Sequence, residues 1–124
     1  MDPQVRTLMG VAVSGLARAV GEPVELLEAK TGLGAARAAW REEPDVVVAD
    51  EITSKMGAFA LARELKGAAE PFSGAVVIIL ERRQDEWLAA WSGADAWFVK
   101  PVNPFELAET VKRLVVLRPK ETVT

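Results

Sequence analysis

A short apolar strand that ends in an acid is the feature that most constrains this chain. Val46 to Ala49 form a continuous apolar run, with Pro44 before it and Asp50 and Glu51 after it. Such a run is typical of a strand buried on both faces of a parallel sheet. In open parallel sheets, ligands and chemistry gather just beyond the carboxyl ends of the strands. Asp50 is therefore a candidate functional residue, the alternative being that it only ends the strand and bonds a loop amide.

Strand and helix patterns alternate along the rest of the chain. Strands are expected at 5–9, 24–28, 46–49, 75–80 and 96–99, and helices at 11–20, 33–42, 58–66, 84–91 and from 104 onward. Gly93 is placed to stop the fourth helix, and Asn103 and Pro104 are suited to cap and begin the fifth. Right-handed connections between five such units predict an α/β fold of three layers around a parallel sheet. We expect one domain over 1–117 and a polar tail over 118–124.

The composition of the 124 residues excludes several classes of protein. The chain has no cysteine and no histidine, which excludes disulfides, thiolate chemistry and a histidine phosphocarrier role. Its net charge of −3 gives no general attraction to nucleic acid or to an anionic membrane, so neither is expected as a partner. No run approaches the ~20 apolar residues of a membrane span, and the N-terminus lacks a secretion signal. A cytoplasmic location is expected.

The chain resembles the receiver domains of two-component response regulators, the CheY-like family. The residues that carry the resemblance are 44–50, Gly93-Ala94-Asp95 and 98–107, where Lys100-Pro101 follows a strand. The resemblance implies a flavodoxin-like fold with strand order 2-1-3-4-5 and a cis Lys100–Pro101 bond. It also implies a phosphoacceptor position at Asp50, a phosphoryl contact at Lys100, and switch positions at Glu81 and Trp97.

Two departures from that family predict an incomplete phosphorylation site. Receivers hold a divalent cation with two acids after the first strand, whereas the matching stretch here, 8–11, contains none. A magnesium site that rests on Asp50 is expected to be weak, because hard cations depend on carboxylates for affinity. The family's hydroxyl residue after the fourth strand is replaced by Glu81, whose charge would repel a phosphoryl group. Glu81 is expected either to turn outward or to pair with Lys100 in place of a phosphate.

Three tryptophans predict an interaction surface. Trp87 and Trp91 are one helical turn apart, and Trp97 lies on the next expected strand. The resemblance implies that the face made by helix four, strand five and helix five is where receivers dimerise or meet partners. Exposed tryptophans there would anchor an interface, and packing in the core is the alternative. Charged residues flank them: Arg82, Arg83, Asp85 and Glu86.

Taken together, these features predict a stand-alone receiver-like domain that acts by protein–protein interaction in two-component signalling. Its partner is expected to be a kinase, an effector or a second copy. No enzymatic activity is expected beyond phosphoryl transfer to Asp50, and no cofactor beyond weakly bound magnesium. One alternative is a conventional single-domain response regulator that is phosphorylated on Asp50. The other is a small flavodoxin-like protein that binds a nucleotide or a flavin.

Overall fold

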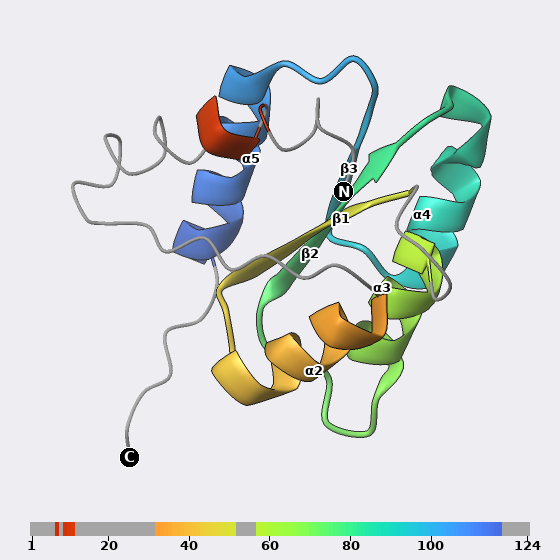
Figure 1. Ribbon diagram of the computed structural model, residues 1–124, viewed down its shortest axis with the longest axis vertical. Helices are drawn as coiled ribbons and strands as arrows, with labels where there is room; N and C mark the ends of the chain where they lie inside the picture. Colours follow the sequence, from red (N-terminus) through yellow and green to blue (C-terminus); the bar gives the residue numbers. More distant parts are fainter. Residues whose placement is uncertain (1–6, 8, 12–31, 52–56, 118–124) are drawn as a thin grey trace.

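The computed structural model describes residues 7, 9–11, 32–51 and 57–117 (Figure 1). Its helices and strands follow the predicted ones closely, and the fourth helix is preceded by a short 3-10 turn. In chain order they are α2 (Gly32–Glu42), β1 (Val46–Asp50), α3 (Gly57–Gly67), β2 (Ala75–Leu80), η1 (Arg83–Asp85), α4 (Glu86–Ser92), β3 (Ala96–Val99) and α5 (Pro104–Leu117).

The three described strands form a parallel sheet in the order β1-β2-β3. Asp50 of β1 lies opposite Ile79 of β2, and Leu80 of β2 lies opposite Val99 of β3. These strands are the third, fourth and fifth of the prediction, and their adjacency agrees with the order 2-1-3-4-5. The strand expected at 24–28 lies outside the described residues.

The strand expected at 5–9 is wrong at the positions that the structure describes. Thr7 and residues 9–11 are helical. The Met9 side chain is buried in a cluster with Val77 of β2 and Leu107 of α5. The segment is too short and too mixed in polarity for its pattern to separate a strand from a helix, so burial of the apolar side chain decides between them.

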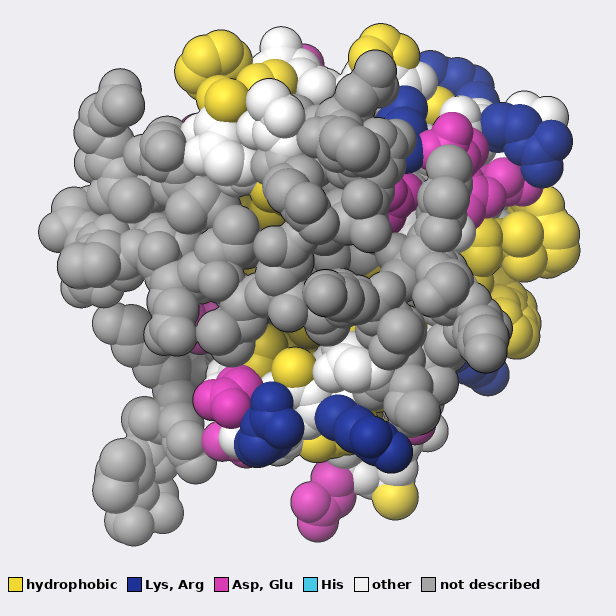
Figure 2. Space-filling model, in the orientation of Figure 1, with side chains coloured by type: hydrophobic (Ala, Val, Ile, Leu, Met, Phe, Trp, Pro, Cys, Tyr) yellow, Lys and Arg dark blue, Asp and Glu magenta, His cyan; other side chains and the backbone are white. Residues whose placement is uncertain are grey.

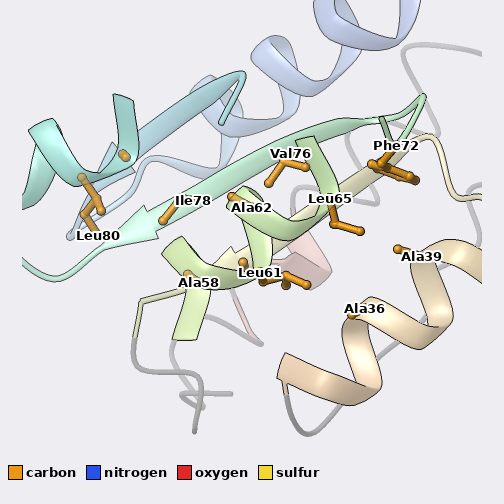
Figure 3. Close-up of a cluster of buried hydrophobic side chains, with 12 residues drawn as sticks. Ala36, Ala39, Ala58, Leu61, Ala62, Leu65, Phe72, Val76, Ile78 and Leu80 are labelled. Atoms are coloured by element: carbon orange, nitrogen blue, oxygen red, sulfur yellow. The ribbon is translucent and has the colours of Figure 1, made fainter. Parts of the chain in front are cut away.

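Helices cover both faces of the sheet, and β2 is the centre of the core. All six residues of β2 are buried. Because side chains alternate along a strand, Val76, Ile78 and Leu80 pack in a cluster with residues of α2, α3 and α4 (Figure 3). Val77 and Ile79 pack on the opposite face, where α5 lies (Figure 1). Burial of each such side chain contributes about 1.5–3 kcal/mol, which makes the strand a rigid support for its end residues.

The predicted helix ends are confirmed. The Oδ1 of Asn103 accepts hydrogen bonds from the backbone N–H groups of Phe105 at 2.8 Å and Glu106 at 3.3 Å, so Asn103 caps α5. Gly93 ends α4 with a φ of 87°, a left-handed conformation that favours glycine. In the part of the chain that the structure describes, no helix has both the length and the apolar character of a membrane span.

Candidate functional site

The carboxyl ends of three adjacent strands bring three charged residues to one edge of the sheet. Asp50 is the last residue of β1, Glu81 follows β2, and Lys100 follows β3. Backbone hydrogen bonds continue the sheet to this edge, from the N–H of Glu51 to the carbonyl of Ile79 at 2.8 Å. A second one runs from the N–H of Lys100 to the carbonyl of Leu80 at 2.9 Å. The structure thus brings together at this edge Asp50 and Lys100, which the sequence analysis named as candidate site residues.

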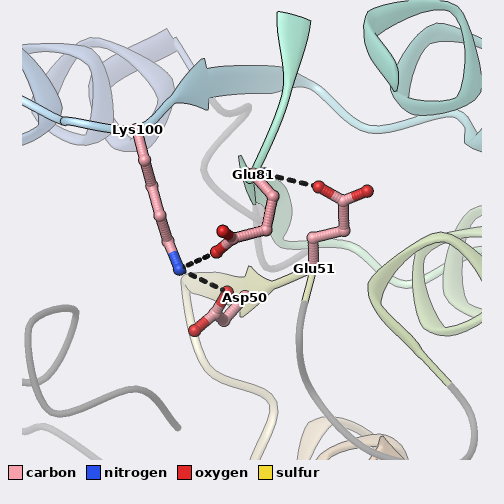
Figure 4. A network of polar contacts seen from close by, with 4 residues as sticks. All are labelled: Asp50, Glu51, Glu81 and Lys100. Atoms are coloured by element: carbon pink, nitrogen blue, oxygen red, sulfur yellow. Dashed lines mark hydrogen bonds and ion pairs between the residues drawn. The ribbon is translucent and has the colours of Figure 1, made fainter. Parts of the chain in front are cut away.

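A single ammonium group contacts two carboxylates at this edge (Figure 4). Lys100 Nζ lies 3.3 Å from Oδ1 of Asp50 and also donates a hydrogen bond to Oε1 of Glu81. The Asp50 side chain is fully buried, whereas 35% of the Glu81 side chain is exposed. A buried carboxylate is costly unless a cation or hydrogen bonds compensate it, and Lys100 supplies that compensation for Asp50. Of the two orientations expected for Glu81, the structure has the one paired with Lys100.

The Lys100–Pro101 peptide bond is cis, as the resemblance implied. Lys100 stands between the last residue of β3 and a turn that leads to the cap of α5. Its side chain extends from that position toward the end of β1 (Figure 4).

The described residues do not fit a divalent cation. They contain no group of three acidic side chains in the arrangement that a metal ion requires. Met9 and Gly10 occupy the stretch where the acidic pair of a receiver is expected, and neither has a carboxylate. The Asp50 carboxylate faces the Lys100 ammonium. Asp2 and Glu22, the other acids near this stretch in the sequence, lie outside the described residues.

Glu51 makes a second polar contact at this edge of the sheet, and the sequence analysis did not single it out. Its Oε2 accepts a hydrogen bond from the backbone N–H of Glu81, which joins the end of β1 to the end of β2 (Figure 4). Burial raises the pKa of Glu51, and the nearby Asp85 carboxyl raises it further, against the lowering effect of the Glu81 N–H and Arg82. The position directly after a buried strand was the available signal for this role.

The structure divides the three tryptophans into two environments. The residues Trp87 and Trp91 of α4 are 67% and 55% exposed, so the alternative that both belong to the core is wrong. Trp97 of β3 is partly buried and packs against the cluster under α3 and α4. Its Nε1 donates a hydrogen bond to Oε2 of Glu86 at 3.0 Å. Part of the Trp97 side chain therefore belongs to the core.

Two further surface residues were missed in the sequence. Arg63 of α3 places its guanidinium carbon 4.9 Å from the ring centroid of Trp91, and Phe105 at the start of α5 is 74% exposed. Figure 2 shows a cluster of hydrophobic side chains over α4 at the right edge of the molecule, with charged side chains of both signs beside it. A single helix pattern does not reveal a contact between residues 28 positions apart, such as Arg63 and Trp91.

Comparison with known proteins connects this site to a family. No family model matches the chain. Two strains of Mycobacterium tuberculosis have an uncharacterized response regulatory protein that is 33% identical over 90 residues, 72% of this chain. The match spans 66% of that relative's length.

Known structures with a similar fold are receiver domains. The receiver domain of a signal transduction histidine kinase from Syntrophus aciditrophicus matches all of this chain and 91% of its own, at 27% identity and a TM-score of 0.72. A CheY-like receiver domain from Methanospirillum hungatei matches 96% of this chain and 93% of its own, at 19% identity and a TM-score of 0.71. The receiver domain of a Pseudomonas aeruginosa sensor histidine kinase, with magnesium in its active-site cleft, is 18% identical. It matches 86% of this chain and 88% of its own, with a TM-score of 0.66.

Removal of the shared cation tests the energetic role of the site. Lys100→Met removes the cation that faces the buried Asp50 carboxylate, so we expect the free energy of unfolding to fall by about 3 kcal/mol. The measurement is urea denaturation monitored by circular dichroism. Adding Asp50→Asn to Lys100→Met should restore part of the loss. Arg41→Met, which breaks the exposed pair of Arg41 and Glu42, is the control and should change stability by less than about 1 kcal/mol. A Lys100→Met protein as stable as the wild type contradicts this account.

The raised pKa of Glu51 predicts a pH dependence of stability. The folded state binds a proton on the Glu51 carboxyl more tightly than the unfolded chain does. The stabilisation that comes from this protonation is complete below the ordinary pKa of 4.5. The effect is lost as pH rises through the higher, folded pKa. We expect the unfolding free energy of the wild type, relative to Glu51→Gln, to decrease as pH rises above 4.5. Because Asp85 raises the pKa of Glu51, the same comparison in an Asp85→Asn background should give a smaller decrease. A wild-type unfolding free energy that instead increases with pH, relative to Glu51→Gln, would refute the raised pKa of Glu51.

Proposed function

Because the chain belongs to the receiver domains of two-component response regulators, we propose that it signals without phosphorylation of Asp50. In this proposal it acts through a protein-binding surface that is formed in the unmodified domain. Residues 1–117 act as one such domain, with no enzymatic activity of their own. The observation that carries the proposal is the contact of Lys100 with both Asp50 and Glu81.

The Glu81 carboxylate takes up the lysine that a phosphoryl group on Asp50 would need. A phosphoryl group adds nearly two negative charges, and it would meet a carboxylate already bonded to that lysine. Two like charges ~4 Å apart repel by several kcal/mol at an effective dielectric constant near ~20. The phosphorylated state therefore requires Glu81 to leave Lys100, and the site favours the unmodified state.

Weak magnesium binding is part of the same proposal. Phosphoryl transfer to a carboxylate depends on a cation that neutralises the transferred charge. The described residues hold no group of three acids arranged for a cation, and Lys100 lies against Asp50 and Glu81. Magnesium requires nearly ideal octahedral geometry and loses its water reluctantly, so carboxylates that already face an ammonium group make a poor site.

A surface that does not depend on Asp50 supports an interaction role. We propose that the face of α4, β3 and α5 binds a kinase, an effector or a second copy. Trp87 and Trp91 offer exposed apolar area there, and Arg83 and Glu86 form an exposed ion pair at the border of α4. Exposed aromatic side chains with a charged rim are the common arrangement of an interface.

Phosphorylation by a small donor tests the first part of this proposal. We expect intact-protein mass spectrometry to find little or no phosphate on the wild type after incubation with acetyl phosphate and magnesium. Glu81→Thr, which returns a hydroxyl to this position and frees Lys100, should be modified more than the wild type. Asp50→Asn serves as the control for the modified residue. Stoichiometric modification of the wild type that disappears in Asp50→Asn would overturn the proposal.

Truncation of either exposed tryptophan tests the second part. Trp87→Ala or Trp91→Ala should weaken the complex, with a second copy or with the cognate kinase, by about 2 kcal/mol. Isothermal titration calorimetry measures the dissociation constant, and circular dichroism checks that the fold is intact. Trp40→Ala on α2 is the matched control, since Trp40 is 43% exposed but distant in the fold from α4. Equal affinities for the three variants and the wild type would refute the interface.

A further inference from the structure

An arginine lies over the ring of an exposed tryptophan where α3 and α4 pack side by side. The Arg63 guanidinium carbon is 4.9 Å from the centroid of the Trp91 ring, within the range of a cation–π contact. One of its nitrogens, Nη1, also approaches the backbone carbonyl oxygen of Trp91 at 3.4 Å. Both contacts restrict the guanidinium, so it loses less conformational entropy when it binds a further group.

The remaining donors of this guanidinium face no carboxylate of the described chain. Two other arginines, which precede α4, do have carboxylate partners. Arg82 Nε lies 3.5 Å from Oδ2 of Asp85, and Arg83 Nη1 lies 3.7 Å from Oε1 of Glu86. Arg63 is exposed, and its contacts in the described residues are those to Trp91. A guanidinium has five N–H donors in a planar fork that matches the two oxygens of a carboxylate.

The apolar part of this surface lies on the next helix. Trp91 and Trp87 are one turn apart on α4, and 55% and 67% of their surfaces are exposed. Arg63 is on α3, so the surface extends from α4 toward α3 and away from α5 (Figure 1). The surface combines apolar contact area with one oriented positive group. It therefore fits a partner that offers both an apolar group and a negative charge.

We infer that Arg63, Trp87 and Trp91 bind a partner-protein segment in which an apolar side chain lies next to a carboxylate. The carboxylate accepts hydrogen bonds from the Arg63 guanidinium, and the apolar side chain packs on the two indole rings. This inference rests on the proposed function in one respect, that the domain acts by binding proteins. It adds the acidic character of the partner and moves the centre of the surface to the α3–α4 side.

Two matched peptides test the inference. They are identical except for Glu or Gln beside two leucines, and each is titrated into the full chain labelled with nitrogen-15. The indole N–H signals of Trp87 and Trp91, assigned with Trp→Phe variants, should shift on titration, and that of Trp40 should not. We expect the Glu peptide to bind about two- to fivefold more tightly than the Gln peptide, an advantage that falls with added salt.

Substitution of the arginine separates binding from a structural role. Arg63→Gln should remove the preference for the Glu peptide, whereas Arg83→Gln, which alters a neighbouring paired arginine, should keep it. Equal affinities of wild type for both peptides, or a preference that survives in Arg63→Gln, would show that Arg63 only joins α3 to α4. Indole shifts that follow protein concentration instead of peptide would assign the surface to a second copy and also overturn the inference. Phosphorylation of Asp50 in the mass assay would refute the proposed function and leave these affinities unchanged.

Discussion

The contact of one lysine with two carboxylates is the interaction on which the rest of this site depends. Lys100 Nζ lies against Oδ1 of Asp50 and Oε1 of Glu81, at the ends of three neighbouring strands. Without that cation, a fully buried carboxylate and a half-buried one would face each other at the edge of the core. The contact therefore compensates the buried charge of Asp50 at the place where the chemistry of a receiver is expected.

The sheet makes this contact possible because it fixes the three backbone positions. The six buried residues of β2 hold β1 and β3 on either side in parallel register. Glu51 adds a second connection, from its side chain to the backbone N–H of Glu81. Glu81 is thus held from both directions, by Glu51 at its backbone and by Lys100 at its carboxylate. Release of Lys100 from Glu81 would break one of these two connections.

In the function proposed above, surface chemistry specifies the partner. The exposed tryptophans of α4 and the arginine of α3 offer apolar area and positive charge for this purpose. Trp97 of β3 links the sheet to α4, since it packs against the core and its indole N–H donates a hydrogen bond to Glu86.

The sequence by itself determined the elements and the place of the site. Apolar runs and the residues that end them are local properties, so the pattern predicted the buried run of β2 and the place of Asp50 at a strand end. The resemblance to receiver domains implied that Lys100 pairs with Asp50. Tertiary structure alone decided that Glu81 turns toward Lys100, that Arg63 lies on Trp91, and that the residues around Met9 are helical instead of extended. These outcomes depend on side-chain rotamers and on contacts between distant segments, whose small free-energy differences no local pattern contains.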